Sequence, residues 1–426
     1  LEKSLLRFDI EKSRYDFYPL FDRYIKGFFQ KREDKDALEA EHACYYLALL
    51  DTVIDEEGNE RGEVLPALKL EMENIEKAWR YATDHTWHEE LFRSSRALQN
   101  FSTLAVQYLL ADKLLTYSLE KAPEDAVNLR IALTANLSAI KYWLGNHEKA
   151  VNLALSAYKL LSKGSIEAKR TLSIIRLIFS VLQASYSTIG KFADSLRVAG
   201  ELVQILREKA HGTPAFGHAL ANSAIHERDI LGKYDVQPFY EALSIAETQT
   251  KTDLPWLLVN LSESLFMIGE IDEAEKTVVR AKNLAEQMGQ PHWLVMSQHR
   301  LAIIKLFQAK IWEALEIVYP LLERVKKHRK PSLTTIIYQL AGQIEMARGN
   351  SQTSWDFYMK ALSEVSTINN VTLANSIKVD ILEWMIRQQD RLASQLQGEL
   401  KNEIARMYVH DQERFNKLVQ EHSPSD

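Results

Sequence analysis

Most of the chain spaces its apolar residues three and four positions apart, and short turns interrupt this helical pattern at regular intervals. The stretch 137–157 (LSAIKYWLGNHEKAVNLALSA) is representative, with a helix, a turn at Gly145-Asn146 and a second helix in succession. Gly145 supplies the backbone freedom that a helix end needs. Small residues, among them Ala150 and Ala157, lie where the two helices would approach each other closely. The pattern therefore predicts a hairpin of two helices.

The same unit recurs along the chain at spacings of 45, 42, 37, 40 and 40 residues, with turns at Gly145, Gly190, Gly232, Gly269, Ala309 and Gly349. The fifth position after the turn is small except at Gln237, and it holds Ala150, Ser195, Ala274, Ala314 and Ser354. The seventh position before the turn holds Ser138, Gln183, Ile225, Ser262, Ala302 and Gly342. A weaker earlier unit has Val106 at its turn. Recurrence at a nearly constant period is the signature of a repeat protein, in which each unit packs only on its neighbours.

With small residues on both helices of each pair, the pattern resembles the tetratricopeptide repeat, whose usual period is about 34 residues. HEAT repeats have a period of about 40–47 residues, but they lack the Gly-x-aromatic-x-x-Ala turn. We therefore favour the interpretation as tetratricopeptide-like repeats. The resemblance implies an all-α solenoid, a right-handed superhelix of helix pairs, over residues 101–388. The first helix of each pair would line a concave groove.

The composition agrees with a helical-repeat fold and excludes several classes of function. A chain of 426 residues exceeds the roughly 250–300 residues at which single cores stop growing. A net charge of −6 argues against a broad surface for nucleic acid or for an anionic membrane. The single Cys44 excludes a disulfide framework and fits a reducing cytoplasm. No apolar run approaches the roughly 20 residues that a membrane-spanning helix needs.

The first 35 residues differ from the rest. Residues 4–8 and 14–18 alternate like two short strands around a polar turn, and Pro19 then opens a helix. The segment from Phe17 to Tyr24 resembles the end of the winged-helix domain in signal-transduction ATPases with numerous domains, the STAND class. That class usually has His before the proline, where this chain has Tyr18. We therefore expect residues 1–35 to be the wing hairpin and helix of such a domain.

Residues 36–100 strengthen this resemblance. The segments His42-Ala43-Cys44-Tyr45-Tyr46-Leu47 and Glu71-Met72-Glu73-Asn74-Ile75-Glu76-Lys77-Ala78-Trp79 are similar to the helical bridge that leads into the repeats of STAND proteins. Between them lies the acidic loop 55–63, which we interpret as solvated. The resemblance implies that a nucleotide-binding ATPase domain lies upstream, and the start at Leu1 rather than Met suggests a piece of a larger protein.

The end of the chain continues the helical pattern. Residues 370–388 read as the first helix of another pair, and residues 389–426 carry apolar positions between Leu392 and Leu418. Because a solenoid needs ends with one polar face, we expect a capping helix there. A coiled-coil partner helix is the alternative.

No motif for catalysis is present in the sequence. It holds no GxxxxGK[ST], GxGxxG, GxSxG or HExxH pattern. His85 and His88 share a helix face and could suggest a metal, but a surface helix start explains them better. The basic run from Arg324 to Lys330 ends a predicted helix, where cations favour the helix dipole. We expect no enzyme, no cofactor, no membrane contact and no direct contact with nucleic acid.

By the geometry of the repeat family, the groove-facing residues lie three, six, nine or ten, and thirteen positions before each turn. From these positions the candidate binding residues are Tyr142, Asn222, His226, Asp229, Trp256, Asn260, Glu263, His299, Arg300, Gln339 and Gln343. Asn and Gln amides can bond both the N–H and C=O of an extended peptide. The opposing interpretation is that these polar groups only meet water in an open groove.

These expectations together describe a cytoplasmic sensor that performs no catalysis. The groove would bind a peptide, a protein or a small-molecule effector, and binding would control the upstream ATPase. The alternative is a stand-alone adaptor or a peptide-pheromone receptor.

Overall fold

The computed structural model describes residues 6–9, 14–17, 24–25, 27–54, 61, 64–105, 107–249, 251, 253–328, 331–368 and 370–422. The chain divides into two compact units, unit 1 (Leu1–Ile178) and unit 2 (Phe179–Asp426). The boundary falls inside α9 (Ala168–Thr188).

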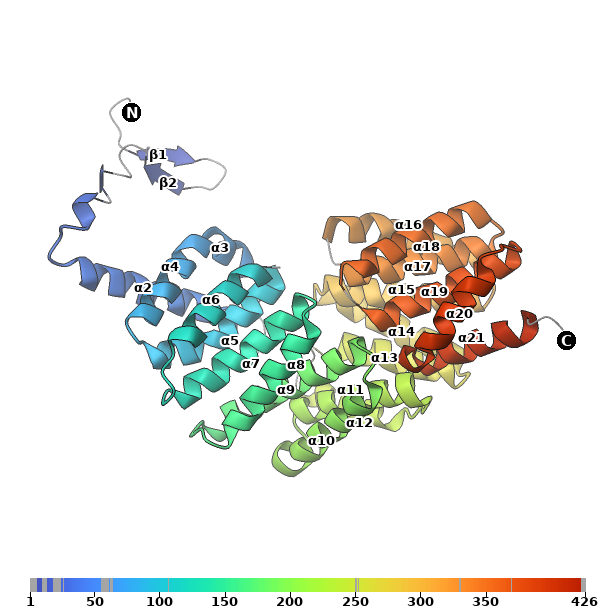
Figure 1. Ribbon diagram of the computed structural model, residues 1–426, viewed down its shortest axis with the longest axis horizontal. Coiled ribbons are helices and arrows are strands. Elements are labelled where there is room, and N and C mark those ends of the chain that lie inside the picture. Colours follow the sequence, from blue (N-terminus) through green and yellow to red (C-terminus); the bar gives the residue numbers. More distant parts are fainter. Residues whose placement is uncertain are drawn as a thin grey trace. The chain divides into compact units, whose positions relative to one another are not determined.

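Unit 1 begins with the expected hairpin, in which β1 (Leu6–Asp9) pairs antiparallel with β2 (Arg14–Phe17) and Leu6 lies opposite Phe17 (Figure 1). Its helices before α9 are α2 (Lys35–Asp51), α3 (Leu65–Leu70), α4 (Met72–Asp84), α5 (His88–Ala105), α6 (Tyr108–Lys121), α7 (Val127–Trp143) and α8 (His147–Leu161). The pair α7 and α8 is the hairpin predicted from residues 137–157.

The two bridge segments of unit 1 contact each other directly. Asn74 on α4 lies 3.4 Å from the His42 ring nitrogen on α2 and donates a 3.2 Å hydrogen bond to the Tyr46 hydroxyl. Trp79 is fully buried, and its indole N–H donates to the Ser118 hydroxyl at 2.8 Å. A buried indole needs such a partner. Of the residues that carry the resemblance, Trp79 therefore lies in the core of unit 1, whereas His42, Tyr46 and Asn74 are half-buried.

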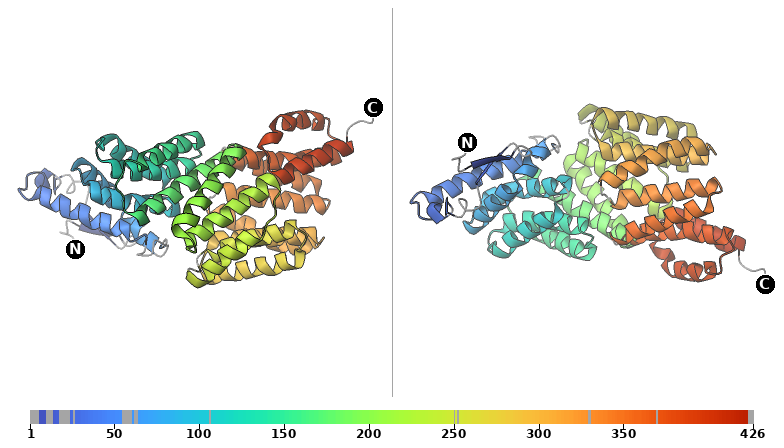
Figure 2. Two further views of the ribbon diagram at one scale, coloured as in Figure 1. Left: turned by 90° about the horizontal axis from the view of Figure 1, so that it is seen from below. Right: turned by 90° about the horizontal axis from the view of Figure 1, so that it is seen from above.

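Unit 2 is a succession of antiparallel helix pairs, which lie side by side in Figures 1 and 2. They are α10 (Phe192–Ala210), α11 (Pro214–Leu231), α12 (Gln237–Gln249), α13 (Leu254–Met267), α14 (Ile271–Gln287), α15 (Pro291–Phe307), α16 (Ile311–His328), α17 (Pro331–Ala347), α18 (Ser351–Ser366), α19 (Val371–Arg387), α20 (Ala393–Glu403) and α21 (Val409–His422). Buried apolar side chains continue from each pair into the next. The all-α helical-repeat prediction is confirmed.

The six predicted turns share one backbone conformation. Gly145, Gly190, Gly232, Gly269 and Gly349 all have φ between 66° and 91°. Ala309 stands at the equivalent turn between α15 and α16 with φ 59°, although it carries a Cβ. This left-handed conformation ends the first helix of each pair and reverses the chain.

The small residues of the repeat meet across each pair. The Ser195 hydroxyl donates to the carbonyl of Gln183 at 3.0 Å, and the Ser354 hydroxyl donates to the carbonyl of Gly342 at 2.8 Å. Gly342 packs so closely that an added Cβ would lie 2.5 Å from the buried Tyr358 ring. The small residues seven positions before and five positions after each turn thus mark the point where two helix backbones approach each other.

The C-terminal segment folds back on the start of unit 2. It forms α20, a 3-10 turn and α21, so two helices stand where one capping helix was expected. The Tyr408 ring stacks on Phe192 at a centroid distance of 5.7 Å, and Arg406 donates to the Ile189 carbonyl at 3.5 Å. The Thr372 hydroxyl likewise donates to the Ser187 carbonyl at 3.2 Å. Residues 185 to 217 positions apart in the sequence therefore come into contact within unit 2.

Some expectations lie outside the described residues. These are the start of the helix after Pro19, most of the acidic loop 55–63, the turn at Val106 and the last two residues of the basic run. Among the described residues, every helix is too short or too polar to cross a membrane.

Candidate functional site

A cavity of about 290 Å³ lies inside unit 2, and the first helices of successive pairs form its wall. Helices α11, α13, α15, α17 and α19 contribute residues, and so do α21 and the loop between α11 and α12. The lining residues are Arg228, Asp229, Tyr234, Glu263, Phe266, Met267, His299, Arg300, Ile303, Ile336, Gln339, Leu340, Gln343, Ser376, His410, Asp411 and Arg414. The volume is at the lower end of the range for ligand pockets, about 300–1,000 Å³.

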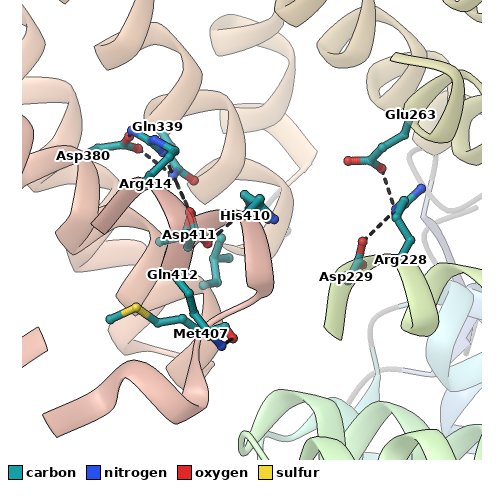
Figure 3. Close-up of polar contacts among 12 residues, drawn as sticks. Arg228, Asp229, Glu263, Gln339, Asp380, Met407, His410, Asp411, Gln412 and Arg414 are labelled. Carbon is teal, nitrogen blue, oxygen red and sulfur yellow. Dashed lines mark hydrogen bonds and ion pairs between the residues drawn. The ribbon is translucent and has the colours of Figure 1, made fainter. Parts of the chain in front are cut away.

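One side of the cavity carries an alternating network of arginines and carboxylates. Arg228 pairs through Nε with Asp229 at 2.8 Å and through Nη2 with Glu263 at 3.0 Å (Figure 3). Arg300 pairs with the other Glu263 oxygen. Burial opposes the charge of Glu263, but the two arginines outweigh burial and lower the pKa of Glu263 to about 2. Glu263 is therefore ionised at neutral pH.

A second network lies on the other side, around Asp380 of α19. The Gln339 amide donates to Asp380 at 2.7 Å, and the Gln343 amide donates to it at 3.0 Å. Arg414 of α21 pairs with the same carboxylate at 2.6 Å, as Figure 3 shows, and with Glu383 at 3.2 Å. The carboxylates raise the pKa of Arg414, Asp380 most of all. The fully buried Asp380 is thus held by two amides and one guanidinium.

Two histidines of the first helices are kept neutral by burial, which lowers the pKa of His226 to about 4 and that of His299 to about 3. His299 lines the cavity, as does Arg300. In the described part of the chain, the His299 Nδ1 and Arg300 Nε atoms are buried without a hydrogen-bond partner. Buried polar atoms are nearly always satisfied, so these two nitrogens of lining residues are exceptions.

The structure brings six of the eleven sequence-predicted residues to this cavity. They are Asp229, Glu263, His299, Arg300, Gln339 and Gln343. The other residues predicted on α11 and α13 do not line it, although they share those helices: Asn222, His226, Trp256 and Asn260. There the Trp256 ring stacks on His218 at 4.2 Å, and the Asn260 amide donates to the Trp256 carbonyl at 2.9 Å. Tyr142 belongs to unit 1, where it contacts Trp143 and His147.

Several lining and supporting residues were not predicted. Ser376 and Asp380 stand thirteen and nine positions before Gln389, which has φ 55° like the other turns. The spacing rule would have found both if Gln389 had been recognised as a turn, but it lacks the glycine signal. His410, Asp411 and Arg414 carry no repeat signal, since α21 lies beyond the last pair.

Among the described residues, no cluster of three or more His, Cys, Asp or Glu side chains is arranged to hold a metal ion. His85 of the suspected pair stacks on the Tyr81 ring at 3.8 Å. The cavity is instead lined by hydrogen-bond donors and acceptors that project from packed helices.

Comparison with solved structures identifies the class of fold. A Rap protein complexed with Competence and Sporulation Factor matches with a TM-score of 0.58 at 11% identity, over 91% of this chain and 100% of that one. The Rap conjugation gene regulator of plasmid pLS20, in complex with the Phr* peptide, matches with a TM-score of 0.54 at 14% identity, over 90% and 99%. Aspartyl phosphate phosphatase F from Bacillus subtilis also scores 0.54 at 14% identity, over 82% and 89%.

At these identities the likeness shows the fold alone, a helical-repeat solenoid of the tetratricopeptide type. No family model matches the chain. No curated protein matches it either.

Proposed function

We propose that unit 2 is a sensor module without catalytic activity, which binds a short peptide or a similar polar effector in the cavity described above. The observation that carries the proposal is the polar cavity itself, which His299 and Arg300 line. In each of these two residues one nitrogen, His299 Nδ1 or Arg300 Nε, is buried without a hydrogen-bond partner. Arg Nε–H is a donor, and a neutral imidazole nitrogen can accept. Together they match the carbonyl and the N–H of a peptide group.

The Rap conjugation regulator, which has a similar fold, is named as a complex with a peptide, and this supports the choice of ligand class. The chemistry of the lining supports it too, because the wall combines donors and acceptors with the apolar Phe266 and Ile303. The absence of a nucleophile–base motif in the sequence favours binding over catalysis.

We further propose that this module regulates a STAND-type protein with an upstream nucleotide-binding domain. The support is the resemblance of residues 1–100, whose bridge residues His42, Tyr46 and Asn74 contact one another in unit 1. A stand-alone adaptor or peptide receptor is the second candidate, and the solenoid likeness to the Rap conjugation regulator favours it. The complete reading frame decides between them: a P-loop upstream supports the first and a short DNA-binding domain supports the second.

The binding test should block the cavity without breaking its ion pairs. Ile303 lines the cavity and is half-buried, so Ile303→Trp fills space, whereas Ile303→Val is the matched control. A pool of synthetic pentapeptides, screened by affinity selection and mass spectrometry, is expected to yield peptides that bind the native chain and the valine variant but not the tryptophan variant. Equal capture by all three proteins would place binding elsewhere.

Glu263 is a poor choice for such a test, although it is among the predicted binding residues. Its removal would leave Arg228 and Arg300 without their shared carboxylate, and a buried charge without a partner destabilises the fold. A loss of binding in that variant could therefore reflect unfolding.

A further inference from the structure

The side of α15 that lines the cavity continues past it as an apolar surface. Arg300, Ile303 and Phe307 are spaced three and four positions apart, so they share one face of the helix. Arg300 and Ile303 line the cavity, and Phe307 follows one turn later and is 65% exposed. Along this helix the polar cavity wall therefore passes into an exposed aromatic ring.

The neighbouring first helix, α13, follows the same order from polar to apolar. Glu263 and Phe266 both line the cavity and lie one turn apart. The two helices are joined at both levels, because Arg300 pairs with Glu263 and the Phe307 ring meets the Phe266 ring. The two ring centroids are 5.1 Å apart, and the ring planes are inclined by 79°. The exposed phenylalanine is thus in direct contact with a residue of the cavity wall.

A single exposed phenylalanine on a protein surface is ordinary. Phe307 differs because its ring and the Phe266 ring, nearly at right angles, form a corner next to the cavity. Aromatic rings prefer edge-to-face or offset contacts at centroid distances of about 4.5–7 Å. A third ring in this corner could contact the face of one phenylalanine and the edge of the other.

We propose that Phe266, Ile303 and Phe307 form an aromatic subsite of the cavity, which takes an aromatic side chain of the peptide effector. The inference rests on the proposed peptide-binding function. Its occupant follows from continuity with the cavity. The seven residues from Arg300 to Phe307 rise about 10 Å along α15, and an extended peptide covers about 10 Å in three residues. A pentapeptide bound at Arg300 therefore reaches the aromatic subsite.

The test compares three sets of pentapeptides, which carry phenylalanine, cyclohexylalanine or alanine at one fixed position and mixed residues elsewhere. Cyclohexylalanine is similar in size to phenylalanine but has a saturated ring, so it separates ring geometry from buried apolar area. The fixed position is moved through all five sites, so that no register is assumed. Enrichment on the immobilised full chain, read by mass spectrometry, gives the relative affinities.

The same sets are applied to Phe307→Ala and Phe307→Tyr, of which only the second keeps a ring. The matched control is Trp312→Ala, because Trp312 is also exposed, at 67%, but lies on α16 with the Arg348 guanidinium 4.8 Å from its ring centroid. Both positions are at the surface, so these variants leave the buried core intact. Circular dichroism and thermal melting establish that each variant is folded.

We expect the native chain to prefer phenylalanine over alanine by about tenfold and over cyclohexylalanine by about two- to fivefold, because an aromatic pair contributes more than its buried area. Phe307→Ala should weaken both preferences several-fold, whereas Phe307→Tyr and Trp312→Ala should keep them. Equal enrichment of phenylalanine and cyclohexylalanine, or unchanged preferences in Phe307→Ala, would overturn the aromatic subsite and leave peptide binding in place.

Two other outcomes also overturn the inference. If sedimentation shows that the native chain self-associates through this surface and that Phe307→Ala does not, a second copy of the chain is the occupant. If none of the three peptide sets binds to the native chain, the peptide-binding function is refuted and the inference with it.

Discussion

Replacement of Arg228 by methionine tests whether the ion network of the cavity wall holds unit 2 together. The Arg228 side chain is 5% exposed and pairs with Asp229 at 2.8 Å and Glu263 at 3.0 Å. It also donates to the carbonyl of Asn260 at 3.2 Å and so ties α11 to α13. Methionine keeps most of the aliphatic volume and removes the charge.

The expected loss of stability depends on which partners Glu263 and Asp229 keep when Arg228 is removed. Removing one partner of a buried ion pair costs about 3–5 kcal/mol, because the other charge is left without compensation. Glu263 keeps Arg300 as a partner, and Asp229 is 21% exposed and can gain hydration. We therefore expect the lower end of the range, about 3 kcal/mol.

Native-state hydrogen exchange, read by mass spectrometry on α11 and α13, is the appropriate assay because solenoids open locally. A loss of about 3 kcal/mol corresponds to exchange faster by more than about 100-fold. The matched control is Arg197→Met, since Arg197 also pairs with two carboxylates but is 58% exposed. An exposed pair contributes about 0–1 kcal/mol. If the Arg228 variant exchanges no faster than this control, the network does not stabilise unit 2.

Three further outcomes are expected. Ala309→Gly should stabilise its turn by up to about 1 kcal/mol in thermal melts, because an alanine at φ 59° carries a steric cost that glycine lacks; a lower melting temperature would contradict this. Gly342→Ala should destabilise α17 and α18 by roughly 1–3 kcal/mol, as local hydrogen exchange would show, since its Cβ would lie 2.5 Å from the Tyr358 ring; unchanged protection would mean that the ring moves freely. Unit 2 should lose stability as the pH falls from about 6.5 toward 4. In the folded chain His226 and His299 have pKa values of about 4 and 3 and stay neutral over this range, whereas in the unfolded chain both bind protons, which favours unfolding. Urea unfolding at pH 7 and pH 5 measures that loss, and His299→Gln should reduce it; equal stability at the two pH values would refute the assignment of neutral histidines.

The helical-repeat fold could be predicted because its signals are local. A turn residue with positive φ and two small residues at fixed distances from it all lie within about 20 residues. The same spacing rule placed Asp229, Glu263 and Gln339 on the cavity wall, because the first helix of each pair presents the same face to the inside. Ala309 adopts the same positive φ as the glycines at the other turns, so the spacing from the turn can be used even where the turn residue is not glycine.

The sequence by itself therefore determined the helix pairs, their turns and some of the residues with which α11, α13, α15 and α17 line the cavity. Only the tertiary structure decided that α21 returns to this cavity and that Arg414 pairs with Asp380. It also decided that Thr372 reaches Ser187, a residue 185 positions away. Such contacts depend on how small rotations between neighbouring pairs add up along unit 2. That sum is set by the packing of every interface at once, so no single repeat carries a signal for it.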